Sequence, residues 1–134
     1  NVLGILPLAR VFEQMRQRFA NLGHCDLHIK GGMALAECIR VNYLVTDLSL
    51  EANRFPPNVC LRIAKAIAEN RTLTALNMSS NQLGRKALRE LGEVLQKGNT
   101  KDAPPLISIN LNHCGLGDEG MGLMADSVEQ NHKL

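Results

Sequence analysis

Two pairs of neighbouring residues, His24–Cys25 and His113–Cys114, place an imidazole next to a thiol in the sequence. A histidine that takes the proton of a cysteine creates a thiolate nucleophile, so such a pair could support covalent catalysis. Adjacent residues of an extended segment point in opposite directions, however, so neither imidazole is expected to reach its own neighbour. The two pairs also belong to repeats about 15 Å apart, three strand spacings of about 4.8 Å. We therefore predict that neither pair is catalytic and that the chain is not an enzyme.

Metal and cofactor chemistry has no better support in the sequence. The four cysteines, Cys25, Cys38, Cys60 and Cys114, are separated by 13, 22 and 54 residues, so no C-x-x-C pair offers two thiolates to one zinc ion. A chain of this length with many leucines does not need disulfides to fold, which favours reduced cysteines and a cytoplasmic protein. Gly-rich phosphate loops and the G-x-S-x-G and H-E-x-x-H motifs are absent, so no cofactor is expected.

The composition is typical of a single domain with an aliphatic core: 134 residues, 45% hydrophobic and only 3% aromatic. Fifteen Lys and Arg against thirteen Asp and Glu give a net charge of +2. The charges are interspersed and stacking aromatics are rare, so a nucleic-acid partner is not expected. No apolar stretch approaches the roughly 20 residues of a membrane-spanning helix. The chain begins at Asn1 rather than at a methionine and stops abruptly at Leu134. We therefore expect it to be a piece of a longer protein.

An eleven-residue pattern recurs along the chain and must organise its fold. The three clear copies are Val45-x-x-Leu48-x-Leu50-x-x-Asn53-x-Phe55, Leu73-x-x-Leu76-x-Met78-x-x-Asn81-x-Leu83 and Leu106-x-x-Ile109-x-Leu111-x-x-Cys114-x-Leu116. A weaker copy has Cys25 and Leu27 at the last two positions. The steps from Cys25 to Asn53 and from Asn53 to Asn81 are 28 residues each, and the step to Cys114 is 33. The third repeat therefore carries five extra residues.

The physical chemistry of this pattern predicts one strand and one helix in each repeat. Apolar and polar residues alternate in Leu48-Ser49-Leu50, so one face of a short strand is buried and the other is wet. The recurring Asn has both an acceptor and a donor pair, which can satisfy backbone groups left open where the strand turns away. Apolar residues then follow helical spacing, as at Cys60, Ile63 and Ile67.

The pattern L-x-x-L-x-L-x-x-N/C-x-L over residues 17–134 resembles that of the leucine-rich repeat proteins, and the 28-residue period is similar to the ribonuclease-inhibitor type. The resemblance implies an α/β solenoid, a horseshoe with short parallel strands on its concave face and helices on its convex face. It also implies about four repeats, with an insertion at residues 98–105. In this type a glycine usually stands at the position of Gly31 and Gly120, from which Val59 and Ala87 depart.

Residues 1–16 precede the regular repeats. Pro7 could open a helix in which Leu8, Val11, Phe12 and Met15 share one face. We expect this segment to be the helix of a preceding divergent repeat or a capping element, because a bare array end exposes its apolar core.

The phase of the strands identifies the side chains of the concave face. They are small and polar with one pair of acids, and they lack the Tyr, Trp and Arg of high-affinity interfaces. This set favours a docking surface for a polar or basic protein, and the alternative is a solvated sheet face. The predicted partner-binding residues are Asp47, Ser49, Glu51, Asn77, Ser79, Ser108, Asn110 and Asn112, and the other outward positions are Phe19, Asn21, Gly23 and Ala75.

The inserted segment is a second candidate contact site. Exposed loops often carry function, and a proline pair keeps part of a loop extended. The candidate residues are Lys101, Asp102, Pro104 and Pro105. The alternative is an insertion that the fold simply tolerates.

These observations predict a non-catalytic protein–protein interaction module or scaffold within a larger assembly. Two alternatives stay open. One is a GTPase-activating regulator of the kind that acts on Ran, for which Arg54 and Asn112 are candidate rim residues. The other is a structural component of a cytoskeletal or ciliary complex. A fold by itself does not choose among them.

Overall fold

Short strands alternate with helices along the chain. The computed structural model describes residues 9–96, 106 and 108–115. Residues 9–14 are helical and precede the first strand. The labelled elements are β1 (Phe19–Asn21), α2 (His28–Val41), β2 (Asp47–Ser49), α3 (Pro57–Glu69), β3 (Ala75–Asn77), α4 (Gly84–Gln96) and β4 (Ser108–Asn110). Each of the three clear copies of the pattern contains one strand, which begins two residues after its first apolar position, and the weak copy contains β1.

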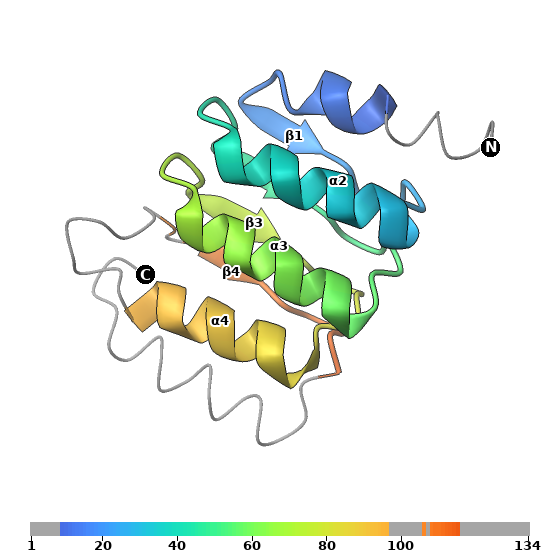
Figure 1. The fold of residues 1–134 in the computed structure, drawn as a ribbon, viewed down its shortest axis with the longest axis vertical. Coiled ribbons are helices and arrows are strands. Elements are labelled where there is room, and N and C mark those ends of the chain that lie inside the picture. The colour runs from blue at the N-terminus through green and yellow to red at the C-terminus, as the bar shows by residue number, and fades with distance from the viewer. Residues whose placement is uncertain (1–8, 97–105, 107, 116–134) are drawn as a thin grey trace.

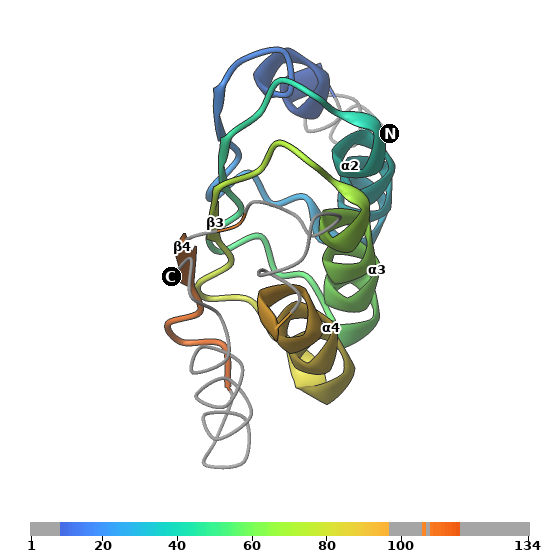
Figure 2. The same ribbon diagram turned by 90° about the vertical axis from the view of Figure 1, so that its left-hand side faces the viewer.

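The four strands form one parallel sheet in chain order. Leu48 of β2 pairs with Ala20 of β1 and with Leu76 of β3, so the sheet keeps the 28-residue offset of the sequence. Ala75 pairs with Ser108, and the five extra residues are therefore absorbed before β4 without shifting the register. Helices α2, α3 and α4 lie side by side behind the sheet (Figure 1), and the side view separates a strand layer from a helix layer (Figure 2). The predicted α/β leucine-rich repeat solenoid is confirmed.

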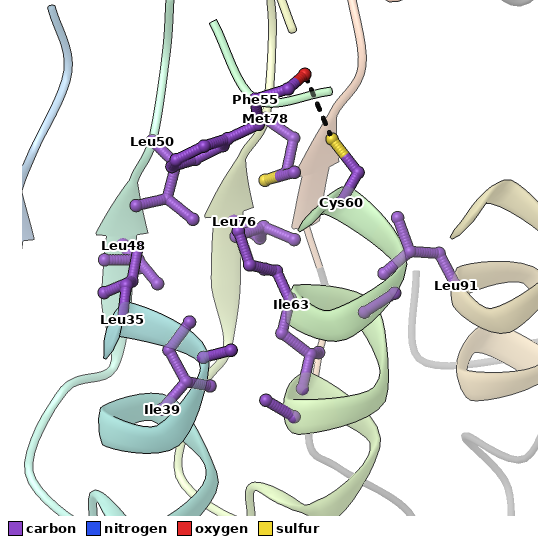
Figure 3. Close-up of a cluster of buried hydrophobic side chains, with 14 of the residues drawn as sticks. Leu35, Ile39, Leu48, Leu50, Phe55, Cys60, Ile63, Leu76, Met78 and Leu91 are labelled. Carbon is purple, nitrogen blue, oxygen red and sulfur yellow. Dashed lines mark hydrogen bonds between the residues drawn. The ribbon is translucent and has the colours of Figure 1, made fainter. Parts of the chain in front are cut away.

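The core lies between these two layers. Leu48 and Leu76 point from the strands toward Leu35 and Ile39 of α2 and Ile63 of α3 (Figure 3), and all five side chains are at most 3% exposed. The strand residues on either side of Leu48 and Leu76 are partly exposed, as the alternation predicts. On α3, Arg62 and Lys65 face outward while the apolar positions of the helical stripe are buried.

The recurring asparagines join consecutive repeats through their side chains. Asn81 Oδ1 accepts hydrogen bonds from the backbone N–H groups of Asn53 (3.0 Å) and Phe55 (3.3 Å) in the preceding repeat. Its Nδ2 donates to the carbonyls of Leu50, Met78 and Ser79 at 2.8, 3.1 and 3.3 Å. Asn53 repeats this arrangement one step earlier and is fully buried. We call this chain of contacts, which joins Cys25, Asn53, Asn81 and Cys114, the strand-end ladder.

A second ladder, which we did not predict, closes the opposite end of the repeats. Asn42 and Asn70 follow α2 and α3, and each accepts the N–H groups two and three residues further on. Their Nδ2 atoms donate backward, from Asn42 to the Met15 carbonyl and from Asn70 to the carbonyls of Ile39 and Asn42. We call this the helix-end ladder. The 28-residue spacing of the two asparagines was the sequence signal for it.

A glycine lets α2 and α3 approach each other. A Cβ on Gly32 would lie 2.3 Å from Cγ1 of Val59 and 2.9 Å from Cε1 of Phe55, so any side chain at this position would force these packed residues to shift. Val59 stands where this type of repeat usually has a glycine, and the space for its side chain comes from Gly32 of the preceding helix. Gly32 in the preceding repeat therefore compensates for the valine that replaces the usual glycine at position 59.

The buried face expected for the first helix is only partly correct. Val11 and Met15 are buried, but Phe12 is 57% exposed. Consecutive helix residues point about 100° apart, so a short helix that buries Val11 and Met15 turns Phe12 toward solvent. Leu8 lies outside the described residues.

The strand-end ladder leads to a stability prediction. Asn81→Ala removes the partner of two buried N–H groups, so the free energy of unfolding should fall by about 1–3 kcal/mol. Urea denaturation followed by circular dichroism measures the change. Asn58→Ala is the matched control, because Asn58 is exposed on the first turn of α3. Equal stability of the two variants would contradict the structural role of Asn81.

Candidate functional site

The concave face contains a shallow open hollow that crosses all four strands. Its volume is about 350 Å³, and it is lined by outward side chains of β1 to β4 together with the buried strand residues Ala20, Leu48 and Leu76. Of the residues predicted to bind a partner, the structure brings five together here: Asp47, Ser49, Asn77, Ser108 and Asn110. Phe19, Asn21 and Ala75 line the same hollow at the neighbouring outward positions.

The remaining three predicted residues of this face lie beyond the ends of the strands and do not line the hollow. Ser79 is only 4% exposed, and its hydroxyl donates to Asn77 Oδ1 at 2.6 Å. The alternation used to predict it fails because β3 ends at Asn77 and the chain turns inward toward Asn81. Glu51 is half-buried at the rim and Asn112 is exposed in the turn after β4.

The asparagines of the hollow present hydrogen-bond donors to solvent. In Asn21, Asn77 and Asn110, Oδ1 accepts the backbone N–H group two residues further on, at 3.0, 2.9 and 3.0 Å. A backbone N–H requires an oxygen, so these contacts orient each amide with its NH₂ group left over. Asn21, Ser49, Asn77 and Asn110 are register partners across the sheet and form one row.

The next row combines an aromatic ring with a carboxylate. Phe19 of β1 pairs in register with Asp47 of β2, and Ala75 and Ser108 continue the row with small side chains. Phe19 is 65% exposed. Asp47 Oδ1 accepts the Thr46 hydroxyl at 2.9 Å, and within the described part of the chain Asp47 makes no ion pair. Asp47 is the single ionisable residue among the described residues that line the hollow.

The rim where strands lead into helices is rich in charge. His24 Nε2 lies 3.9 Å from Glu51 Oε2, and Asp26 Oδ1 contacts His28 Nε2 at 2.6 Å and Arg54 Nε at 3.7 Å. Arg54, a candidate for GTPase activation, is highly exposed. The other candidate contact site, Lys101, Asp102, Pro104 and Pro105, lies outside the described residues.

The two imidazole–thiol pairs are not assembled as catalytic pairs. The Cys114 thiol is buried and donates to the Met78 carbonyl at 3.2 Å, while His113 is exposed. The Cys25 thiol donates to the Gly23 carbonyl, and His24 turns toward Glu51 instead. Both histidines adopt a positive φ, as do Ala52 and Ser80 at the same phase. This left-handed turn, which no glycine marks in the sequence, separates each imidazole from its neighbouring thiol.

Burial makes the core thiols weak acids. Burial raises the pKa of Cys60 to about 12, with the neighbouring Cys114 as a second cause. Burial also raises the pKa of Cys114, whereas hydrogen bonds from the backbone N–H groups of Asn81 and Ser80 lower it. The Cys60 thiol donates to the Phe55 carbonyl within the core (Figure 3). Across the described residues, no three His, Cys, Asp or Glu side chains gather closely enough to hold a metal ion.

None of the helices in the described ranges has the length and apolarity needed to cross a membrane.

Comparison with known proteins points to one family. A family model described as Leucine Rich repeat matches residues 69–92 and 103–125. NACHT, LRR and PYD domains-containing protein 13 of Homo sapiens is 33% identical over 75 residues, which make up 56% of this chain and 7% of that protein. RAN GTPase-activating protein 2 of Arabidopsis thaliana is 26% identical over 110 residues, 81% of this chain and 19% of that protein. The chain thus spans less than a fifth of the length of each of these relatives.

A solved structure shares the fold. The structure titled Leiomodin-1 Actin-Binding Site 2 superposes with a TM-score of 0.73 at 22% sequence identity, over 96% of this chain and 74% of that one.

The thiol environments lead to a labelling prediction. At pH 8 a thiol with a pKa near 12 is almost wholly protonated. Iodoacetamide should therefore modify Cys60 at least about 100-fold more slowly than the half-buried Cys25. Mass spectrometry of tryptic peptides from a time course measures both rates, and labelling in urea should abolish the difference. Equal rates in the folded protein would contradict the buried position of Cys60.

Proposed function

The chain is a leucine-rich repeat protein, and from this premise we propose that it is a non-catalytic module that binds another protein on its concave face. The observation that carries the proposal is the hollow that crosses β1 to β4, whose lining includes the outward polar side chains of all four strands. Recognition surfaces commonly consist of exposed side chains, many of them polar, that a rigid scaffold holds in place.

Polar groups of the concave face remain available to a partner. On the helical side, one cluster of charges is internally paired, with Arg40 held by Glu37 at 3.0 Å and 4.0 Å from Glu69. In the hollow, the Asp47 carboxylate and the three oriented amides keep capacity for a partner. A surface whose hydrogen-bonding groups are already fixed loses little entropy on binding.

The partner should be polar or basic, because the hollow and its near rim carry the carboxylates Asp47 and Glu51 and no basic residue lines the hollow in the described part of the chain. Glu51 and Asn112 are proposed as flanking contacts at the end of the strands. Lys101, Asp102, Pro104 and Pro105 are proposed as a further contact on sequence grounds alone.

GTPase activation is the second candidate function. It is favoured by the similarity to RAN GTPase-activating protein 2, which extends over 81% of this chain. In that case the array would complete the active site of a GTPase, with the exposed Arg54 or Asn112 in contact with it.

Charge reversal of the concave face tests the binding proposal. Asp47→Arg combined with Glu51→Arg should abolish co-purification of the partner from the source, because it places two positive charges against a basic surface. The matched control is Arg62→Glu combined with Lys65→Glu, which reverses two exposed charges of α3 and should retain the partner. Crosslinking mass spectrometry of both complexes identifies the contact residues. If only the control variant loses the partner, the interface lies on the helices and not on the concave face.

Single-turnover hydrolysis separates the second candidate function from the first. If the chain is a binding module, GTP hydrolysis by a Ran-type GTPase should proceed at the same rate with and without it. An acceleration of about 1,000-fold or more, lost in Arg54→Ala or Asn112→Ala, would instead establish GTPase activation. Lys86→Ala, an exposed substitution on α4, is the control for non-specific charge effects.

A further inference from the structure

We propose that the hollow of the concave face holds an arginine side chain of the partner, with the guanidinium between the Phe19 ring and the Asp47 carboxylate. The inference rests on the proposed function, because it specifies the chemistry of the partner on that same surface. It follows from the position of an exposed aromatic ring beside a carboxylate that makes no ion pair within the described residues.

Phe19 is the first half of this binding site. Its side chain is 65% exposed because it faces outward from β1, whereas the next residue, Ala20, faces the core and is buried. The ring stands at the end of the hollow beside Asn21, and the described residues of the hollow include no second aromatic side chain. The face of an exposed aromatic ring attracts cations through its quadrupole.

Asp47 is the second half. It is the register partner of Phe19 on the adjacent strand, and both side chains line the hollow. Parallel strands lie about 4.8 Å apart, so one flat cation can cover the ring and still reach the carboxylate. The Thr46 hydroxyl occupies Oδ1 and orients the carboxyl group, while Oδ2 has no hydrogen-bond partner within the described residues.

The geometry favours arginine over lysine. A guanidinium is planar, stacks on an aromatic face and donates several N–H groups in its own plane, whereas an ammonium is compact and strongly hydrated. Charge-assisted hydrogen bonds from such a group to a carboxylate are among the strongest polar contacts that proteins make.

The rest of the face can accommodate the chain that carries the arginine. Ala75 and Ser108 follow Asp47 in the same row, and their small side chains leave the hollow open. The free NH₂ groups of Asn21, Asn77 and Asn110 lie one row away, where they can donate to main-chain carbonyls of the bound segment. The positive side chain and the carbonyl acceptors of a single peptide segment therefore both find complementary groups.

Titration with short peptides tests the proposal on the whole chain. The probe is acetyl-Ser-Gly-Arg-Gly-Ser-amide, and the matched probes carry citrulline or lysine in place of arginine. In ¹H–¹⁵N spectra, the arginine peptide should shift the amide signals of Phe19, Asp47 and Ser49. The citrulline peptide, which is flat but neutral, should bind at least about tenfold more weakly, and the lysine peptide about threefold more weakly.

Three variants assign the contacts. Asp47→Asn keeps the acceptor for Thr46 but removes the charge, and it should weaken binding of the arginine peptide about tenfold. Phe19→Leu keeps an apolar side chain but removes the ring, and it should weaken binding about threefold. Glu93→Gln removes an exposed acid on α4 and should leave binding unchanged. Unchanged spectra away from the hollow show that each variant is folded.

The outcomes distinguish this inference from the proposed function. Equal binding of the arginine and citrulline peptides, or shifts confined to the helices, would overturn the arginine site. If the charge-reversed concave variant still loses the natural partner in that case, concave binding stands with a different chemistry. If the arginine peptide binds as expected but the variant keeps its partner, the hollow binds arginine but not that of the partner, and both the proposed interface and the assignment of the arginine to the partner are wrong.

Discussion

The structure depends on one constraint: every backbone group at the buried end of a strand needs a hydrogen-bond partner, and a three-residue strand cannot supply it from its own repeat. The side chain of an asparagine from the next repeat does so. Asn81 reaches the N–H groups of Asn53 and Phe55 and the carbonyl of Leu50. Each repeat is therefore completed by its successor, which is the physical meaning of a solenoid whose units contact only their neighbours.

This constraint also sets the character of the concave face. The two ladders hold both ends of the repeats, so the strands between them are fixed in register and their outward side chains project from a rigid sheet. The same residue type then serves two purposes. Asn53 and Asn81 are buried and hold the repeats together, whereas Asn21, Asn77 and Asn110 use their oxygen in a local turn and, within the described residues, leave the NH₂ group without an acceptor. The position in the repeat, and not the residue type, decides which purpose applies.

The comparisons show the scaffold and do not address the outward residues. The two relatives are differently named proteins, and this chain spans less than a fifth of the length of each. The solved leiomodin structure shares the fold at 22% identity. Substitutions on the wet face leave the buried hydrogen bonds of the two ladders untouched. Asp47, which makes no ion pair within the described residues, and the exposed Phe19 contribute to neither ladder.

The sequence by itself determined the period, the order of strand and helix, the buried stripe of each helix and the role of Asn53 and Asn81, because these follow from local alternation and from a repeat that is visible in the residues. It also indicated most of the residues that line the hollow. Only the tertiary structure decided where the alternation stops, as at Ser79, which turns inward because the next asparagine draws the chain into the core. It alone showed that Asn42 and Asn70 form a second ladder and that Gly32 makes room for Val59. It confirmed that Phe19 and Asp47, which the 28-residue phase puts at equivalent positions, are register partners. The second ladder and the contact of Gly32 with Val59 depend on side chains from different repeats, which local sequence patterns do not encode.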